Sequence, residues 1–536
     1  MGCKFEFQSK PIQKIVPKPI EFSQEKALIV EEEIQTLLKK GAISRSFPEN
    51  DQFISNIFLV KKKNGKFRPV LNLTKLNEFI QYHHFKQEHF SLVITAIERN
   101  AYFVSVDLTD AYFSISIHKE HRKYLKFFWK DTLYEFNCLC FGVSSAPRIF
   151  TKIMKPVFSY FRKLGISSFF YIDDSLATSI DREICSNQFK FMTETLRSLG
   201  FFINEEKSSP IPSQKITFLG YIIDSQEFKV YLPEEKVQKI LEACSEIISK
   251  HQVVKIRAIA QLLGLFSSST HAVELAPLFS RFLNRDKVKA PESHQNYDKT
   301  IRISREARQE IIWWQENLCK VNGRNIRPDK IGAYLETDAS MEGWGGRFGE
   351  FKTSGRWSLS ESSLHINILE IKAIKYTLVS LCKNVSNFHL CVKSDSATAV
   401  SYINRKGGSV MSLFIECKEI WLWCCARKIH ISAVHVKGKQ NLVADYLSRV
   451  FSDSTEWKLN EDVFSLICAQ TFKPDIDLFA SRLNRQMKKF VSWLPDPEAF
   501  AVDAFTISWS NFKPYIFPPF SLLSRVIKKI QEDRLT

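Results

Sequence analysis

The sequence predicts an α+β protein made of several domains. Its 536 residues exceed what one hydrophobic core usually organises, since domains average roughly 150 residues. Strand-like runs alternate with helical patterns as far as residue 230, a helix-rich stretch follows, and a second alternating pattern fills residues 331–450. Hydrophobic residues make up 44% of the chain and charged residues 25%, a composition that excludes a largely disordered chain.

Changes in pattern and composition mark the expected segment boundaries. The segments are residues 1–25, 26–230, 231–330, 331–450 and 451–536. Prolines in the first segment predict an extended lead-in, and a helical pattern from Gln24 to Lys40 then closes at Gly41, a typical helix stop. The third segment combines helices with a polar stretch, residues 284–300, that is typical of a linker. The last is a Pro-rich tail.

The charge balance favours a polyanionic partner. Lys and Arg number 75 against 58 Asp and Glu, a formal net charge of +17. Binding of such a chain to nucleic acid is favoured because neutralised phosphates release counterions. Charge alone does not separate a nucleic-acid-binding protein from other basic proteins.

Cysteine usage and hydropathy indicate the compartment. The 12 cysteines contain no C-x-x-C pair, and scattered thiols fit a reducing environment better than a secreted disulfide framework. The N-terminus lacks an apolar signal core, and no stretch approaches the ~20 apolar residues of a membrane span. We expect an intracellular protein, cytoplasmic or nuclear, without a membrane partner; no pattern indicates its oligomeric state.

A first group of carboxylates follows strand-like patterns. Alternation over residues 103–108 places Val104 and Val106 on one face and Asp107 on the other, so Asp107 is expected to end a strand on its non-core side. The apolar run at residues 169–172 is interrupted by Asp173 and Asp174 and then resumes, which predicts a hairpin with both acids at the turn.

An isolated Asp-Asp pair is more often simply a turn. Three converging carboxylates, however, would repel one another without a cation. Two divalent ions roughly 3.5–4 Å apart would relieve the repulsion and activate a 3′-hydroxyl for attack on a nucleoside triphosphate.

The motifs around these acids resemble those of reverse transcriptases. Tyr171-Ile-Asp173-Asp174 resembles the Y-x-D-D box, and the segment from Asp107 to Tyr112 resembles the first carboxylate motif of the family. The resemblance implies a right-hand polymerase with fingers, a ferredoxin-like palm and a helical thumb and connection. It implies that the three acids hold two Mg²⁺ ions, or Mn²⁺ in their place.

Further blocks of the family occur in the expected order. Lys62 and Arg68 lie in a fingers-like segment that would grip the triphosphate, and Gly142 lies in a segment resembling the template-positioning loop. Leu219 and Gly220 resemble the primer grip. The nucleotide-binding residues implied are Lys62, Arg68, Asp110, Ala111, Tyr112 and Gly142. Tyr112 would reject a 2′-hydroxyl; alone, it would more often be a core residue, and a lysine run a solvated surface.

A second group of carboxylates lies in residues 331–450. Asp338 follows a strand-like run and precedes a Gly-rich hairpin, Gly343–Gly349, and Asp395 ends another strand. Glu370 lies inside the apolar stripe of a predicted helix, where a carboxylate is unfavourable unless paired or metal-bound. Asp445 lies in the helical segment Asn441–Arg449. Individually, all but Glu370 are more often surface groups or helix caps.

As a set these acids resemble the tetrad of ribonuclease H, with strand, helix, strand and helix contexts in order. The resemblance implies an α/β ribonuclease H-like domain that binds two more ions and cleaves RNA paired with DNA. His435 matches the mobile histidine that assists product release in that family. The implied partners are an RNA template, a DNA primer, an RNA–DNA hybrid and deoxynucleoside triphosphates. The rival hypothesis is a catalytically decayed, nucleic-acid-binding remnant.

The sequences of two segments, His365–Glu370 and Tyr402–Gly408, are similar to those of DIRS-type retrotransposons. The tail resembles the Dam-like adenine methyltransferases that accompany such polymerases, which hold a flipped base with a polar residue before Pro-Pro. Phe517 replaces that residue ahead of Pro518-Pro519-Phe520, so we expect a structural remnant without methyltransferase activity. We expect hybrid cleavage to survive deletion of the tail, unless the tail is an integral part of the preceding domain.

Overall fold

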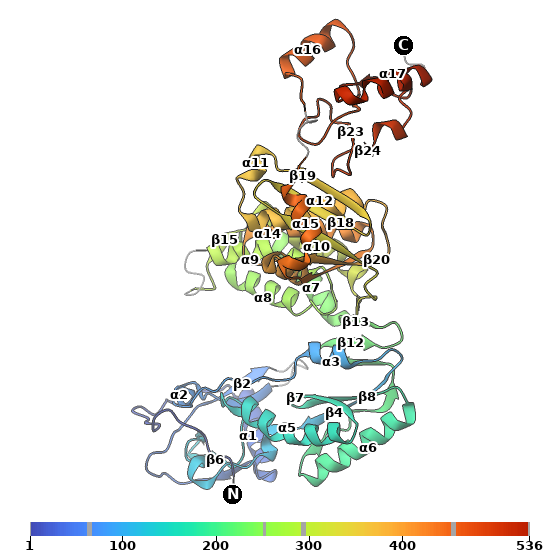
Figure 1. The fold of residues 1–536 in the computed structure, drawn as a ribbon. Coiled ribbons are helices and arrows are strands. Elements are labelled where there is room, and N and C mark those ends of the chain that lie inside the picture. Colours follow the sequence, from blue (N-terminus) through green and yellow to red (C-terminus); the bar gives the residue numbers. More distant parts are fainter. Residues whose placement is uncertain (1, 62–66, 250–252, 291–295, 452–456, 534–536) are drawn as a thin grey trace. The chain divides into compact units, whose positions relative to one another are not determined.

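The structure, a computed structural model, describes residues 2–61, 67–249, 253–290, 296–451 and 457–533. Two compact units make up the chain, and Figure 1 shows that both mix helices and strands. The first unit consists of residues 1–239, 271–273 and 319–326, and the second holds the remainder. No described helix has the length and apolar character needed to cross a membrane.

The first unit contains helices and several small antiparallel sheets. Its elements are α1 (Gln24–Lys39), β1 (Ile43–Arg45), β2 (Ile57–Lys61), β3 (Phe67–Leu71), α2 (Thr74–Asn77), α3 (Phe90–Ala96), β4 (Tyr102–Thr109), η1 (Ala111–Ser114), α4 (Lys119–Arg122), β5 (Lys126–Trp129), β6 (Thr132–Phe136), α5 (Ala146–Lys163), β7 (Ser167–Tyr171), β8 (Asp174–Ser179), α6 (Arg182–Ser198), β9 (Phe202–Ile203), β10 (Ser209–Ser213), β11 (Lys215–Phe218), β12 (Tyr221–Asp224), β13 (Lys229–Tyr231) and β16 (Arg324–Asn325). The predicted first helix is confirmed as α1, which buries Val30, Ile34 and Leu37 along one face.

A central sheet in the order β10-β4-β8-β7, with β9 also on β4, forms the middle of this unit. Helix α5 packs on β7, and α6 packs on β4 and β8. Three phenylalanines of α5, Phe150, Phe158 and Phe161, are fully buried, and burying each such side chain contributes about 1.5–3 kcal/mol. The predicted alternation in β4 is confirmed from Val104 onward: Val104, Val106 and Leu108 are buried, and Asp107 lies on the other, partly exposed face.

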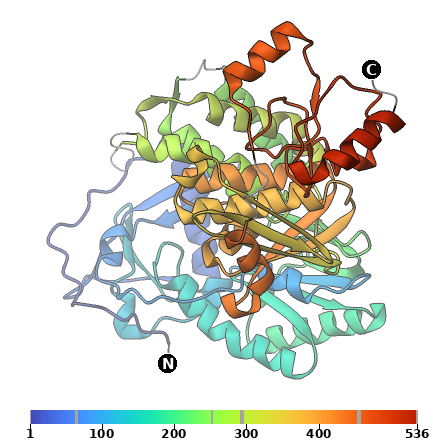
Figure 2. The same ribbon diagram turned by 45° about the horizontal axis from the view of Figure 1, so that its top comes forward.

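The second unit begins with helices and continues into a five-stranded sheet. Figure 2 shows the ribbon from a second direction. Its elements are β14 (Val253–Lys255), α8 (Ile256–Ser267), η2 (Ala276–Phe279), α9 (Arg281–Lys289), β15 (Thr300–Arg302), β17 (Ala333–Ala339), β18 (Gly343–Phe348), β19 (Phe351–Arg356), α11 (Leu359–Ser362), α12 (Ile366–Leu381), β20 (Phe388–Ser394), α13 (Ala397–Arg405), α14 (Met411–Ala426), β21 (Ile429–His435), η3 (Gly438–Gln440) and α15 (Leu442–Arg449). Helices α7 (Glu234–Ser249) and α10 (Arg305–Val321) contribute residues to both units.

The sheet has the order β19-β18-β17-β20-β21. Strands β17, β18 and β19 are antiparallel, whereas β20 runs parallel to β17 and β21 runs parallel to β20. The predicted Gly-rich hairpin is present: Gly343–Phe348 form β18, and Gly349, with φ 59°, begins the tight turn that leads to β19. A Cβ on Gly345 would lie 2.5 Å from the Leu447 side chain, and one on Gly346 would lie 2.2 Å from Thr377. The glycines therefore serve close packing of helices on the sheet.

The predicted linker at residues 284–300 is partly wrong, because residues 284–289 belong to α9, which extends to Lys289. Glu310 of α10 is buried and accepts hydrogen bonds from the backbone N–H groups of Arg281, Phe282 and Leu283. These are first-turn N–H groups that a helix leaves unpaired. A contact from a distant helix thus stabilises a helix that its own polar sequence does not reveal.

The tail forms a small α/β subdomain of the second unit. Its elements are α16 (Glu461–Gln470), β22 (Ile476–Asp477), β23 (Val491–Ser492), β24 (Ala501–Val502), η5 (Ala504–Thr506), β25 (Pro514–Tyr515), η6 (Phe520–Leu522) and α17 (Leu523–Glu532). Strand β22 pairs in parallel with β25, and β23 pairs in parallel with β24. A separate hydrophobic cluster around the fully buried Trp509 gives the tail its own core.

Candidate active sites

The first site lies where β4, β7 and β8 meet. Asp107 of β4 stands directly opposite Asp174, the first residue of β8. The sequence predicted that Asp107 ends its strand, but β4 continues to Thr109, so Asp107 lies within the strand. Ile172 and Asp173 form the turn between Tyr171 and Asp174, which pair across β7 and β8. The predicted acidic hairpin is thus present, with Asp173 in the turn and Asp174 just after it.

The backbone of this hairpin is strained. Ile172 has φ 54°, an unfavourable region for a β-branched residue, at a cost of about 1–3 kcal/mol. Its side chain packs against the core of the unit. The backbone N–H of Leu108 donates a hydrogen bond of 3.0 Å to the carbonyl of Asp173. These contacts hold the turn, and with it Asp173, beside β4.

The electrostatics of the first site favour a cation. Burial, the nearby Asp107 and the nearby Asp173 raise the pKa of Asp174 to about 6. Lys207 opposes this shift, with its Nζ 3.8 Å from Asp107 Oδ1. The N–H of Asp107 donates to Ser208 Oγ over 3.0 Å, which fixes the strand at this point. Carboxylates that raise one another's pKa are a suitable donor set for a divalent ion.

The second site brings together acids from β17, α12 and the end of β20. Asp338 is in β17, Glu370 in the first half of α12, and Asp395 directly follows β20. One ligand oxygen from each lies within 4.8 Å of the others. Within the described ranges, this is the only set of acids, histidines or cysteines with such a grouping. The ligand oxygens of Asp107, Asp173 and Asp174 in the first site do not form one.

Burial perturbs the acids of the second site strongly. Burial is the largest cause that raises the pKa of Glu370 to about 9, followed by the charges of Asp338 and Asp395. Burial likewise raises the pKa of Asp338 to about 6, against a hydrogen bond from Ser448 that lowers it. The buried Glu370 Oε2 has no hydrogen-bond partner among the residues that the structure describes. An unpartnered buried carboxylate oxygen beside two other acids fits a metal ligand.

Asp445 and His435 lie at the edge of this group. Asp445 is in α15, and its Oδ1 accepts a hydrogen bond of 2.8 Å from Arg449 Nε. It does not belong to the three-residue group. His435 is the last residue of β21, is exposed, and its Nε2 lies 3.0 Å from the carbonyl oxygen of Asp395. The structure therefore brings three of the four predicted acids together and places His435 beside one of them.

Part of the chain matches the model of a known family. Residues 60–223 match the family described as "Reverse transcriptase (RNA-dependent DNA polymerase)". This segment contains Asp107, Asp173 and Asp174.

Curated relatives of the chain include viral polyproteins. The enzymatic polyprotein of cauliflower mosaic virus (strain Strasbourg) is 23% identical over 468 residues, which are 83% of this chain and 64% of the polyprotein. That of figwort mosaic virus (strain DxS) is 21% identical over 467 residues, 82% of this chain and 65% of the polyprotein. The chain thus spans just under two thirds of the length of these relatives.

Solved structures of the foamy viral protease-reverse transcriptase share the fold. The complex with double-stranded DNA has a TM-score of 0.51 and 16% identity, and the match covers 81% of this chain and 87% of that one. The complex with an RNA/DNA hybrid has a TM-score of 0.50 and 16% identity, covering 85% of this chain and 60% of that one. The predicted α+β fold class, a reverse transcriptase fold followed by a further domain, is confirmed.

The loop after β4 carries the nucleotide-binding residues predicted for a reverse transcriptase. Asp110 has φ 49° and forms an ion pair of 2.6 Å with Lys40, a partner that sequence reasoning missed. Ala111 and Tyr112 begin the short helix η1 and are buried. Lys40 fixes Asp110 and thereby the start of this helix.

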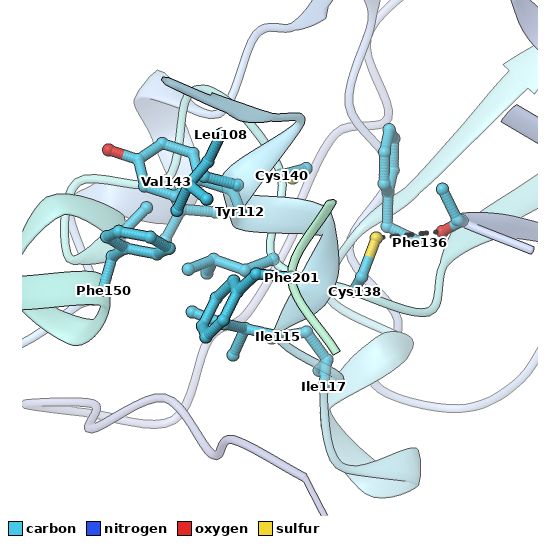
Figure 3. Packing of buried hydrophobic residues seen from close by; sticks show 14 of the residues in the cluster. Leu108, Tyr112, Ile115, Ile117, Phe136, Cys138, Cys140, Val143, Phe150 and Phe201 are labelled. Carbon is cyan, nitrogen blue, oxygen red and sulfur yellow. Dashed lines mark hydrogen bonds between the residues drawn. The ribbon is translucent and has the colours of Figure 1, made fainter. Parts of the chain in front are cut away.

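Tyr112 packs into the core of the first unit. Its ring contacts Phe150 edge-on at 5.6 Å and Phe141 at 5.2 Å. Figure 3 shows the ring beside Phe150, with its hydroxyl oxygen at the edge of the cluster. Burial, followed by the charge of Asp173, raises the pKa of Tyr112 to about 12. The side chain thus has a core contact and an edge that faces the acidic site.

Gly142 lies in a loop held by an amide that the sequence did not single out. Asn77 Nδ2 donates to the Gly142 carbonyl over 2.9 Å, and the Ser144 N–H donates to Asn77 Oδ1 over 2.9 Å. With φ 106°, and with a Cβ that would lie 2.8 Å from the Leu71 carbonyl oxygen, position 142 requires glycine.

Three of the remaining predicted residues lie in or beside antiparallel strand pairs. Leu219 and Gly220 form the turn between β11 and β12, with φ 49° and 75°. Two consecutive positive φ values are typical of a tight hairpin turn, and Leu219 adopts one without being glycine. Arg68 is part of β3, and Lys62 lies outside the described residues.

Proposed function

We propose that the chain is an RNA-directed DNA polymerase whose second unit contains a ribonuclease H for RNA–DNA hybrids. The observation that carries the proposal is the pairing of Asp107 with Asp174 beside the Asp173 turn, inside the segment that matches reverse transcriptases. Hybrid cleavage rests on the group formed by Asp338, Glu370 and Asp395.

In the polymerase site, Asp107, Asp173 and Asp174 would hold divalent cations, Mg²⁺ or Mn²⁺. When bound, such ions lower the pKa of a coordinated hydroxyl and offset charge that develops on the phosphates. The carboxylates supply the negative charge that selects a divalent cation, and the strained turn fixes their spacing. Tyr112 supports the sugar of the incoming deoxynucleoside triphosphate, and the Gly142 loop supports the template base.

In the ribonuclease H site, Asp338, Glu370 and Asp395 would hold the ions, with Asp445 completing the set from α15. The unpartnered Glu370 Oε2 supports this assignment, since a cation would supply the missing partner. His435, exposed at the end of β21, would exchange a proton with a departing product. Its Nε2 lies 3.0 Å from the carbonyl oxygen of Asp395, which keeps the ring beside this acid.

The implied partners are an RNA template, a DNA primer, their hybrid and deoxynucleoside triphosphates. The net charge of +17 and the nucleic acids bound in the foamy viral structures support nucleic-acid binding. We further propose a DIRS-type retrotransposon as the source and an intracellular location, cytoplasmic or nuclear. These rest on the sequence resemblance and composition.

The alternative is a decayed remnant that binds nucleic acid without catalysis. The experiment is primer extension with Mg²⁺ on matched RNA and DNA templates, together with cleavage of a labelled RNA strand in a hybrid. Wild-type protein is expected to extend the primer and cut the RNA, and chelation of the metal is expected to stop both. Binding of the hybrid without either reaction would establish the remnant instead.

A further inference from the structure

A buried arginine connects the tail, residues 457–533, to the rest of the second unit. Arg482 and Glu361 are each only 9% exposed, and Arg482 Nη1 donates to Glu361 Oε2 over 2.8 Å. Arg482 Nη2 donates to the carbonyl of Arg356, also over 2.8 Å. A surface ion pair contributes little, whereas a buried one leaves a charge without its partner when either side chain is removed.

Glu361 is held from its other side by the helical part of the domain. The Ser358 N–H and Oγ each donate to Glu361 Oε2 over 2.9 Å, and the Tyr376 hydroxyl donates to Oε1. Burial acts to raise the pKa of Glu361, but the hydrogen bonds from Tyr376 and Ser358 and the charge of Arg482 outweigh it and lower the pKa to about 2. Glu361 is therefore ionised and joins the tail to Tyr376.

Tyr376 extends this connection to the candidate ribonuclease H site. It belongs to α12, the helix that carries Glu370. Its ring contacts Trp344 at a centroid distance of 5.4 Å. Trp344 of β18 pairs with Ala339, the neighbour of Asp338 in β17. One continuous set of contacts thus runs from Arg482 to the helix and the strand that carry two of the clustered acids.

Other contacts hold the same part of the tail in place. The Arg482 N–H donates to Asp496 Oδ2 over 3.1 Å within the tail. Lys383 Nζ, just beyond α12, donates to the Ala499 carbonyl over 3.0 Å, and Thr353 of β19 donates to the Pro495 carbonyl. The tail therefore contacts the domain at α11, just beyond the C-terminal end of α12 and on β19, so its attachment does not depend on one ion pair alone.

We propose that residues 457–533 are an integral part of the second domain and that Arg482 is a positioning residue, which holds α12 and Glu370 against the strand that carries Asp338. The catalytic consequence of this inference rests on the proposed ribonuclease H function. Of the two outcomes considered for deletion of the tail, intact or impaired hybrid cleavage, the contacts favour impaired cleavage. The contacts also predict that loss of Arg482 loosens the spacing of Glu370 and Asp338.

The test compares Arg482→Met with Arg482→Lys and with a matched control, Arg485→Met. Arg485 lies in the same loop and pairs with Glu498 over 2.7 Å inside the tail, away from α12. Hybrid cleavage, primer extension and thermal unfolding are measured on the full chain. Mn²⁺ binding is measured by calorimetry in an Asp107→Asn/Asp173→Asn background, so that the first site contributes little.

We expect Arg482→Met to lower kcat for hybrid cleavage by roughly ten- to a hundredfold with little change in KM, as for small misplacements of reacting groups. Mn²⁺ binding is expected to weaken in Arg482→Met, whereas primer extension by this variant is expected to stay within about twofold of wild type. Arg482→Lys is expected to restore part of the loss. Arg485→Met is expected to behave as wild type.

Two results would overturn the inference. One is wild-type Mn²⁺ binding and cleavage by Arg482→Met. The other is an equal loss in Arg482→Met and Arg485→Met, which would show that only folding of the tail matters. Absence of hybrid cleavage in the wild-type protein would count against the proposed function alone, because Mn²⁺ binding by the same variants still decides the role of Arg482.

Discussion

The hydroxyl of Ser448 donates a hydrogen bond of 2.7 Å to Asp338 Oδ2, and both residues are buried. Ser448 lies on α15, the helix that also carries Asp445. The bond orients one carboxylate of the candidate ribonuclease H site from a neighbouring element. It also lowers the pKa of Asp338 against the larger effect of burial.

Ser448→Ala should therefore weaken both the domain and its reaction. A hydrogen bond to a charged group contributes about 1.5–3 kcal/mol, so the free energy of unfolding is expected to fall by that order. Denaturant unfolding and hybrid cleavage measure the two effects, with Ser409→Ala, an exposed serine of the same unit, as the control. Unchanged stability and cleavage in Ser448→Ala would show that the bond does not position Asp338.

The metal-free protein should lose stability as the pH rises. Asp338 and Glu370 have pKa values raised to about 6 and about 9 from 3.8 and 4.5, so the folded state keeps protons that the unfolded state releases. Their contribution is fully present below about pH 4 and is lost as the pH rises through about 6 to 9. The melting temperature should be lower at about pH 8 than at about pH 5, and Glu370→Gln should reduce the difference.

Added Mg²⁺ completes this test. At about pH 8 it should raise the melting temperature of wild type more than that of Glu370→Gln, since binding to the folded state stabilises it. Calorimetric scans of both proteins with and without Mg²⁺ make the comparison. A pH response that is identical in wild type and Glu370→Gln would contradict the burial of this carboxyl group.

Tyr112→Val should admit ribonucleotides more readily. Its ring packs on Phe150, and its hydroxyl edge faces the acidic site, where the proposed sugar would lie. The ratio of kcat/KM for matched ribo- and deoxynucleoside triphosphates measures the effect. Phe150→Leu, which alters the same packing without opening the sugar position, is the control. An unchanged ratio in Tyr112→Val would make Tyr112 a core residue only.

Binding of a template–primer should weaken steeply with salt. The chain carries a net charge of +17, and each neutralised phosphate of B-form DNA adds about −0.9 to the slope of log K against log salt concentration. Fluorescence anisotropy over a salt series gives this slope, and a slope of several units is expected. A flat response would place the excess charge away from the nucleic acid.

Sequence patterns predicted the strands and helices that carry the acids better than they predicted the distant residues that position those acids. Asp107, Asp173 and Asp174 follow apolar runs whose strand character is local. Ser448, in contrast, is separated from Asp338 by 110 positions, and no local pattern indicates that pairing. Asn77 is likewise 65 positions from Gly142.

Tertiary packing accounts for two features that local sequence patterns do not explain. Glycine weakens the interior of a strand, but β18 contains Gly345 and Gly346 because Leu447 and Thr377 occupy the space of their Cβ atoms. The polar stretch near residue 284 forms a helix because Glu310, from α10, accepts its first N–H groups. Such contacts arise only when distant elements meet, so a single sequence does not show them.

We propose that the chain has two independent metal-dependent sites. Asp173→Asn and Asp338→Asn, assayed side by side for single-turnover primer extension and for hybrid cleavage, test it most directly. Loss of charge stabilisation by a bound metal ion implies a drop of roughly a hundred- to ten-thousandfold in the affected reaction. We predict that Asp173→Asn loses extension and keeps cleavage, and that Asp338→Asn does the reverse. Equal loss of both reactions in either folded variant, or loss of neither, would contradict the account.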